Sequence, residues 1–196
     1  MKRLFDILFS FIVLVILFPF FIVIALFIVI DSRGGVFYKQ VRVGKGGNDF
    51  KLFKFRSMKT NADKGSLLTV GGNDSRITRI GLFIRKYKLD ELPQLINVLI
   101  GDMSLVGPRP EVRRYVDLYN DLQKQVLTVK PGITDYASIE YSNENEILGK
   151  AENPEQVYIN EIMPAKLKLN LKYIADQSFS TDLKILFKTI QKVASH

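Results

Sequence analysis

The sequence predicts a mainly helical protein with a small β element, held against a membrane. Three observations lead to this prediction: an apolar segment over residues 7–30, helical spacing of apolar residues in several later segments, and a short stretch of alternating β-branched and aromatic residues. The chain has 196 residues, enough for one domain of ordinary size beside the apolar segment. We therefore expect two parts, a membrane helix over residues 1–31 and a membrane-associated domain over residues 32–196.

The apolar segment is interrupted only by Ser10 and Pro19. As a straight helix it would be about 36 Å long, against a hydrocarbon core of roughly 30 Å, which favours a spanning helix. Two features weigh against a simple span: Pro19 removes a backbone hydrogen bond near the middle, and both flanks are basic, so charge gives no direction for crossing. A helix broken at Phe18-Pro19 could enter and leave on one face. The residues alone leave both topologies open, because kinked helices also span membranes.

A hairpin is predicted directly after the membrane segment. The segments "VFYKQVRV" and "FKLFKFRSM" alternate in character and flank the turn-rich "GKGGND". The glycine spacing matches neither dinucleotide-binding nor P-loop patterns, so we interpret it as a turn. Residues 60–75 are small and polar, and predict a loop that could close over a site.

Helical spacing predicts four further helices. The first covers residues 77–86. In the second, Asp90 lies at or next to the N-cap, Pro93 falls in the first turn and Gly101 ends the helix. The third covers residues 111–126, with these side chains directed inward: Val112, Tyr115, Tyr119, Leu122 and Val126.

The last predicted helix covers residues 181–194, with Ser180, Thr181 or Asp182 as its cap. Lysines recur along one face of it, at positions 184, 188 and 192. Such a basic amphipathic helix suits an anionic membrane surface, and an ordinary solvated lysine face is the alternative.

Composition excludes several kinds of site. The chain has no cysteine, and its one histidine is His196, so disulfides, zinc clusters and thiol nucleophiles are excluded. Catalysis would depend on acidic, basic or hydroxyl side chains, with a hard cation that prefers oxygen ligands. The net charge of +8 points to anionic partners such as lipid head groups, nucleotides or nucleic acid.

Two adjacent carboxylates, Asp90 and Glu91, follow a segment over residues 76–88 that holds five basic residues and no acid. Helix capping explains them without chemistry, since Asp is a preferred N-cap and Glu suits a first turn. The alternative is catalysis on a phosphate, in which a carboxylate attacks phosphorus and a metal ion spreads the charge.

Basic residues elsewhere favour the phosphate interpretation. Arg109 stands between two prolines in "GPRP", where a stiff backbone would aim its planar fork of donors at phosphate oxygens. Arg85 lies one element upstream of the carboxylates, and Lys54 and Arg56 of "KFRSM" add further positive charge.

These motifs together resemble the bacterial sugar transferases, the small monotopic phosphoglycosyl transferases. The resemblance covers nearly the whole chain, through "KRLFDI", "VRVG", "FKLFKFRSM", "LDELPQLINVLIGDMSLVGPRP" and "VKPGIT". It implies a re-entrant membrane helix broken at Phe18-Pro19, then a compact helical catalytic domain with amphipathic interfacial helices. It also implies a monotopic protein on the cytoplasmic face of the bacterial inner membrane.

The resemblance further implies a two-step reaction. Asp90 matches the nucleophile that attacks the β-phosphate of a UDP-sugar and releases UMP, and the phosphosugar then passes to undecaprenyl (polyprenyl) phosphate, the first membrane step of surface glycan assembly. Glu91 matches a magnesium-binding glutamate, so Mg²⁺ is the expected cofactor. Arg109 matches an arginine that holds phosphate, and Lys54 and Arg85 match basic residues at the same site, although a surface or membrane-facing role suits these two as well.

The expected partners are therefore the UDP-sugar donor, the polyprenyl phosphate acceptor, membrane lipids and downstream glycosyltransferases. A second copy of the chain is a further candidate, and nucleic acid is not expected. The chain departs from the family pattern after "PGIT", where it reads Asp135-Tyr136-Ala137-Ser138, and at Ser57 and Lys88. Two other functions stay open: a basic membrane-anchored adaptor without catalysis, and a metal-dependent phosphohydrolase.

Overall fold

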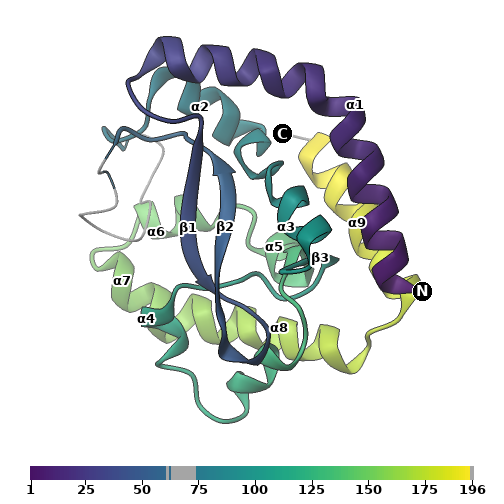
Figure 1. The fold of residues 1–196 in the computed structure, drawn as a ribbon. Helices are drawn as coiled ribbons and strands as arrows, with labels where there is room; N and C mark the ends of the chain where they lie inside the picture. Colours follow the sequence, from purple (N-terminus) through teal and green to yellow (C-terminus); the bar gives the residue numbers. More distant parts are fainter. Residues whose placement is uncertain (61, 63–73, 195–196) are drawn as a thin grey trace.

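The computed structural model describes residues 1–60, 62 and 74–194, and the fold is mainly helical with two small sheets (Figure 1). This confirms the predicted fold class at that level. Most of the predicted loop over residues 60–75 lies outside the described residues. By length and composition, one helix in the described part of the chain could cross a membrane: α1 (Lys2–Asp31).

Helix α1 bends near its middle, so that its first part runs beside α9 (Phe179–Ala194) and its second part passes α2 (Arg79–Lys86), as Figure 1 shows. The helix nevertheless continues through Phe18 and Pro19, where the sequence predicted a break. Most of its apolar side chains are exposed.

The first turns of α1 are fixed to the rest of the protein by polar contacts. Arg3 donates to the backbone carbonyls at the end of α3 (Gln94–Ile100), one of them at 2.9 Å. Asp6 is buried and accepts from the hydroxyl of Ser104 at 2.8 Å and from the N–H of Leu105 at 3.3 Å. These contacts explain why a carboxylate occurs at the start of an apolar helix.

The end of α1 is fixed as well. The buried guanidinium of Arg56 donates to the carbonyls of Ser32 at 2.7 Å and Arg33 at 2.6 Å, the two residues that directly follow the helix. Asp31 accepts from the N–H of Ile80 at 3.0 Å. Arg56 therefore serves the backbone at the end of α1, and the expectation that it adds charge for an anionic ligand is wrong.

The predicted hairpin is confirmed. Strands β1 (Phe37–Val43) and β2 (Asp49–Phe55) pair antiparallel, and the glycines between them form a turn with a short 3₁₀ segment, η1 (Lys45–Gly47). The buried side chain of Asn97 in α3 binds the free edge of β2: it donates to the carbonyl of Lys51 at 2.8 Å and accepts from the N–H of Phe53 at 2.9 Å. This contact holds the middle of β2 against α3.

A second, parallel pair joins β3 (Ser104–Val106) to β4 (Gly132–Thr134), which the sequence did not predict. The two backbones approach closely just beyond β3, where a Cβ atom added to Gly132 would lie 2.1 Å from the backbone nitrogen of Gly107. Only glycine fits there, and the segments "GPRP" and "PGIT" are thereby held side by side.

The helix predicted over residues 111–126 is wrong as one element. The segment forms α4 (Arg113–Val116) and a separate 3₁₀ helix, η4 (Gln123–Thr128). The division occurs at Asn120 and Gln123, whose side chains each accept from the other's backbone N–H at 2.9 and 3.0 Å and so start a new turn. Leu122, predicted to point inward, is 61% exposed.

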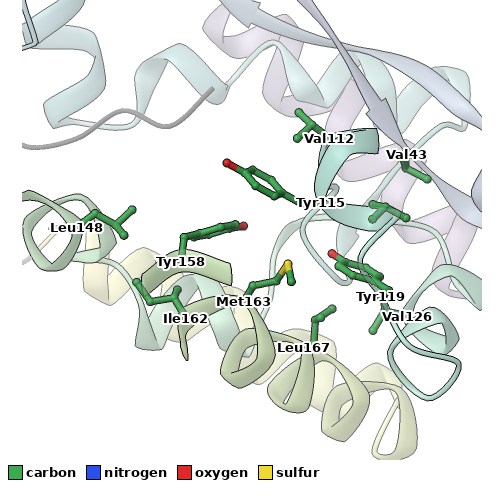
Figure 2. Packing of buried hydrophobic residues seen from close by; sticks show 11 residues of the cluster. Val43, Val112, Tyr115, Tyr119, Val126, Leu148, Tyr158, Ile162, Met163 and Leu167 are labelled. Atoms are coloured by element: carbon green, nitrogen blue, oxygen red, sulfur yellow. The ribbon is translucent and has the colours of Figure 1, made fainter. Parts of the chain in front are cut away.

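The other side chains predicted to be buried in this segment do enter a core cluster, which Figure 2 shows. Tyr115 packs on Tyr158, with ring centroids 4.9 Å apart, and side chains of α8 (Met163–Ala175) close the cluster. Short elements lead to α8: α5 (Tyr136–Glu140), α6 (Glu144–Gly149), α7 (Pro154–Val157) and the π-helical η5 (Tyr158–Ile162).

The predicted helices at residues 77–86 and 181–194 are confirmed as α2 and α9. The cap of α9 is Ser178, whose hydroxyl accepts from the N–H of Thr181 at 3.1 Å, and not one of the three predicted residues. Helix α9 exposes Leu183, Phe187 and Ile190 beside its lysines.

Candidate active site

The two carboxylates lie in a short 3₁₀ turn, η3 (Leu89–Glu91), that joins α2 to α3. Lys88 precedes it with φ +56°, the left-handed conformation that non-glycine residues rarely adopt. The N-cap of α3 is Pro93, with no side-chain cap, so the prediction that Asp90 caps this helix is wrong. The conformation of this turn fixes the positions of Asp90 and Glu91. Capping of α3 therefore does not explain why two carboxylates occur here.

Glu91 is held by two cations. Arg109 donates from Nη1 to Oε2 at 3.0 Å and from Nη2 to Oε1, while the ammonium of Lys54 lies 3.1 Å from Oε1. Burial opposes ionisation of this carboxyl, but the charges of Arg109 and Lys54 outweigh it and hold the pKa of Glu91 well below its usual range. Glu91 is therefore an ionised anchor for both cations.

Asp90 has a different environment although it is the neighbouring residue. It is 6% exposed, and its carboxylate makes no hydrogen bond or ion pair with any residue that the structure describes. Burial and the charge of Glu91 raise the pKa of Asp90, opposed by the charges of Lys54, Arg85 and Lys88. A buried carboxylate with free oxygens beside several cations is suited to attack an anionic centre that those cations hold.

The backbone of Arg109 is held by Asp135, the first of the residues after "PGIT" at which the chain departs from the family pattern. Asp135 is fully buried; its Oδ2 accepts from the backbone N–H of Arg109 at 3.1 Å, and its Oδ1 accepts from the N–H of Ser138 at 2.6 Å. Asp135, which departs from the family pattern, thus supports the loop that carries Arg109. Sequence reasoning missed this role; the Asp-x-x-Ser pattern could at most have indicated a helix cap.

A second support was also missed. Arg42 donates to the carbonyl of Pro110 at 3.1 Å and to Glu111 at 2.9 Å, and the hydroxyl of Tyr158 donates to the other oxygen of Glu111. These contacts fix the end of "GPRP" to β1 and to η5. The three residues are far apart in sequence, and no local pattern joins them.

The structure brings together four of the predicted site residues: Asp90, Glu91, Lys54 and Arg109. Arg85, in the last turn of α2, is part of the same electrostatic environment through its effect on Asp90, but its side chain makes no hydrogen bond or ion pair with a described residue.

The described residues contain no cluster of three or more acidic or histidine side chains that could hold a metal ion. The carboxylates of Asp90 and Glu91 form a smaller donor set. Mg²⁺ is commonly bound by one or two carboxylates together with substrate phosphates and water, so this pair fits an ion that arrives with a diphosphate. Lys54 and Arg109 already neutralise the charge of Glu91. The two carboxylates therefore suit a metal ion that brings a diphosphate better than one bound by the protein alone.

Comparison with known proteins gives a consistent result. The model of the family described as bacterial sugar transferase matches residues 1–196. The chain is 38% identical over 195 residues to a UDP-glucose:undecaprenyl-phosphate glucose-1-phosphate transferase of Klebsiella pneumoniae, covering 97% of this chain and 39% of that protein. It is 37% identical over 197 residues to a UDP-N-acetylgalactosamine-undecaprenyl-phosphate N-acetylgalactosaminephosphotransferase of Aeromonas hydrophila, covering 98% of this chain and 43% of that protein.

The chain thus spans about two fifths of the length of these two relatives. A third relative is matched nearly end to end: the exopolysaccharide production protein PSS of Rhizobium leguminosarum bv. phaseoli is 38% identical over 198 residues, which cover 97% of this chain and 93% of that protein.

Proposed function

Because the chain belongs to the bacterial sugar transferase family, we propose that it transfers a sugar 1-phosphate from a UDP-sugar to undecaprenyl phosphate, giving UMP and a polyprenyl-diphosphate-sugar. The names of its relatives support both substrates, and one relative's role in exopolysaccharide production supports a place at the first membrane step of surface glycan assembly.

One observation carries the proposal: Asp90 is a buried carboxylate without a partner among the described residues, next to a Glu91 that holds Arg109 and Lys54. In the first step an oxygen of Asp90 attacks the phosphorus that bears the sugar. The bond from this phosphorus to the bridging oxygen breaks, and UMP leaves with the electron pair. The sugar phosphate remains on Asp90 as an acyl phosphate, which divides one difficult transfer into two easier ones.

In the second step a phosphate oxygen of the polyprenyl phosphate attacks the same phosphorus and displaces the Asp90 carboxylate. The cations act in both steps. The planar fork of Arg109 can bind two phosphate oxygens, and Glu91 keeps it and Lys54 in place before substrate arrives, so little reorganisation is needed as charge develops.

Mg²⁺ is the proposed cofactor, held by Glu91 and the donor diphosphate, where it would neutralise charge on the phosphate oxygens. The ionised state of Glu91, with its lowered pKa, supports this role.

We further propose that α1 enters and leaves the bilayer on the cytoplasmic face of the bacterial inner membrane. Both of its ends contact the same protein body, through Arg3 and Asp6 at the start and Arg56 at the end. A helix that crossed the bilayer would separate its ends by roughly 30 Å of hydrocarbon. A tag at Met1 should accordingly be labelled from the cytoplasm alone, and periplasmic labelling would show a spanning helix.

The activity can be tested with the protein in nanodiscs, supplied with Mg²⁺, undecaprenyl phosphate and a panel of UDP-sugars. We expect UMP release and a lipid-linked sugar with at least one donor, and loss of both in Asp90→Asn. The exposed Asp117 provides a matched Asp117→Asn control that should keep full turnover. Normal turnover of Asp90→Asn would remove the nucleophile, and release of sugar phosphate to water without lipid product would show a phosphohydrolase.

A further inference from the structure

An open groove with apolar walls lies between the last turns of α1 and helix α2, which are neighbours in Figure 1. Its volume is about 710 Å³. Within the described part of the chain its lining comprises Phe27, Ile30 and Asp31 of α1 and Arg79, Ile80 and Phe83 of α2. Phe27 and Phe83 are 54% and 52% exposed, so two aromatic rings remain open to a ligand.

The groove is connected to the active site through a shared core. Beneath it, Ile28 of α1 packs with Ile84 of α2, and both are almost fully buried. Leu89 packs against the same cluster, and the next residue is Asp90. The cluster that supports the groove thus extends to the residue before Asp90.

The charge around the groove favours an anionic ligand. The segment that contains α2, residues 76–88, holds five basic residues and no acid. The described lining holds one base, Arg79, which forms no ion pair with a described residue, and one acid, Asp31, which accepts from the N–H of Ile80 at its side of the groove. Apolar walls on a cationic helix complement a molecule with a hydrocarbon tail and a phosphate head.

We propose that this groove binds the polyprenyl tail of the acceptor and directs its phosphate along α2 toward Asp90. This inference rests on the proposed function, since it assigns a place to that reaction's lipid substrate. Helix α2 has 8 residues and is about 12 Å long, far shorter than a long polyprenyl chain. The head can thus reach Asp90 while part of the tail stays between Phe27 and Phe83.

Crosslinking tests the groove without relying on catalysis. A photoreactive benzoylphenylalanine replaces Phe83 in the full-length Asp90→Asn protein, held in phosphatidylcholine nanodiscs that contain a small fraction of undecaprenyl phosphate. The matched control carries the probe at Leu82, which is 50% exposed on the same helix but does not line the groove. We expect the yield of crosslinked undecaprenyl phosphate to be about tenfold higher with the probe at Phe83 than with the probe at Leu82. Added phosphatidylglycerol should not reduce the yield at Phe83.

Equal capture at both positions would overturn the proposal, because it would show ordinary contact with the bilayer. Displacement by phosphatidylglycerol would also overturn it, in favour of a general site for anionic lipids. Selective capture at Phe83, together with no sugar transfer by the wild-type protein under the same conditions, would support the groove and contradict the proposed function, so the two failures are distinguishable.

Kinetics provide a second test. Phe83→Ala should raise the KM for undecaprenyl phosphate about tenfold and leave single-turnover UMP release without acceptor unchanged, because that half-reaction needs no lipid. Leu82→Ala should change neither quantity. An unchanged lipid KM in Phe83→Ala would contradict a role of the groove in acceptor binding.

Discussion

The ammonium of Lys2 lies 2.5 Å from Oδ2 of Asp182, although 180 residues separate the two in sequence. The other oxygen of Asp182 accepts from the hydroxyl of Tyr173 at 2.7 Å, and Lys2 also donates to the carbonyl of Val106 at 3.0 Å. The first turn of α1 is thus joined to α8, α9 and β3 by one buried polar network.

Removal of the acid in this network should destabilise the protein. The side chain of Asp182 is 5% exposed, so Asp182→Ala removes the counter-ion of Lys2 and the shorter acceptor of Tyr173, leaves both to share the carbonyl of Val106 as an acceptor, and should lower the free energy of unfolding by about 3 kcal/mol. The side chain of Lys2 is 31% exposed, so Lys2→Ala should cost only about 1 kcal/mol. Denaturation in detergent measures the free energy of unfolding of both variants and of Lys188→Ala, an exposed control on α9. Equal stability of Asp182→Ala and this control would contradict a stabilising role of the network.

Asp90→Asn should make the protein more stable at neutral pH while it abolishes turnover. The pKa of Asp90 is higher in the folded than in the unfolded protein, mainly because of burial, so its charge destabilises the fold at any pH above the folded pKa. The gain in Tm should shrink as pH falls through the folded pKa and vanish below the unfolded one. Thermal unfolding of both proteins in EDTA, measured as a function of pH, gives this difference in Tm. A lower Tm of Asp90→Asn than of the wild type at neutral pH would contradict the prediction, because it would show that the folded protein stabilises the charge of Asp90.

Glu91 should couple metal binding to nucleotide binding. Because Lys54 and Arg109 already neutralise this carboxylate, we expect weak calorimetric binding of Mg²⁺ alone and at least about tenfold tighter binding with a UDP-sugar present. Glu91→Gln should lower turnover about a hundredfold and remove this coupling. An unchanged magnesium response in Glu91→Gln would place the metal elsewhere.

Asp135 should matter for donor binding although its carboxylate contacts the backbone of Arg109 and Ser138 and not Asp90. Asp135→Ala leaves the buried N–H of Arg109 without an acceptor, at a cost of about 1–3 kcal/mol, and should raise the KM for the UDP-sugar. Asp135→Asn keeps one acceptor oxygen and should lie between this variant and the wild type. Steady-state kinetics with saturating lipid measures the difference; equal KM values in all three proteins would show that Arg109 needs no such support.

Sequence reasoning succeeded where a feature is local or repeated. The hairpin, α2 and the end of α3 at Gly101 all follow from short patterns. It failed where a distant partner decides the outcome. In the sequence Arg56 looks like a surface cation, and only the structure shows that it donates to carbonyls at the end of α1. The spacing of apolar residues over 111–126 looks helical, but the hydrogen bonds between Asn120 and Gln123 start a new turn there.

The anchoring of α1 at both ends also constrains the order of events during biosynthesis. Helix α1 leaves the ribosome before the domain that follows it, and Arg56 emerges soon enough to bind the backbone at the end of the helix. The partner of Lys2 is made 180 residues later, after all the other elements that this helix contacts. Until then the beginning of the helix lacks its counter-charge, and α9 must arrive before the helix is fixed along its whole length.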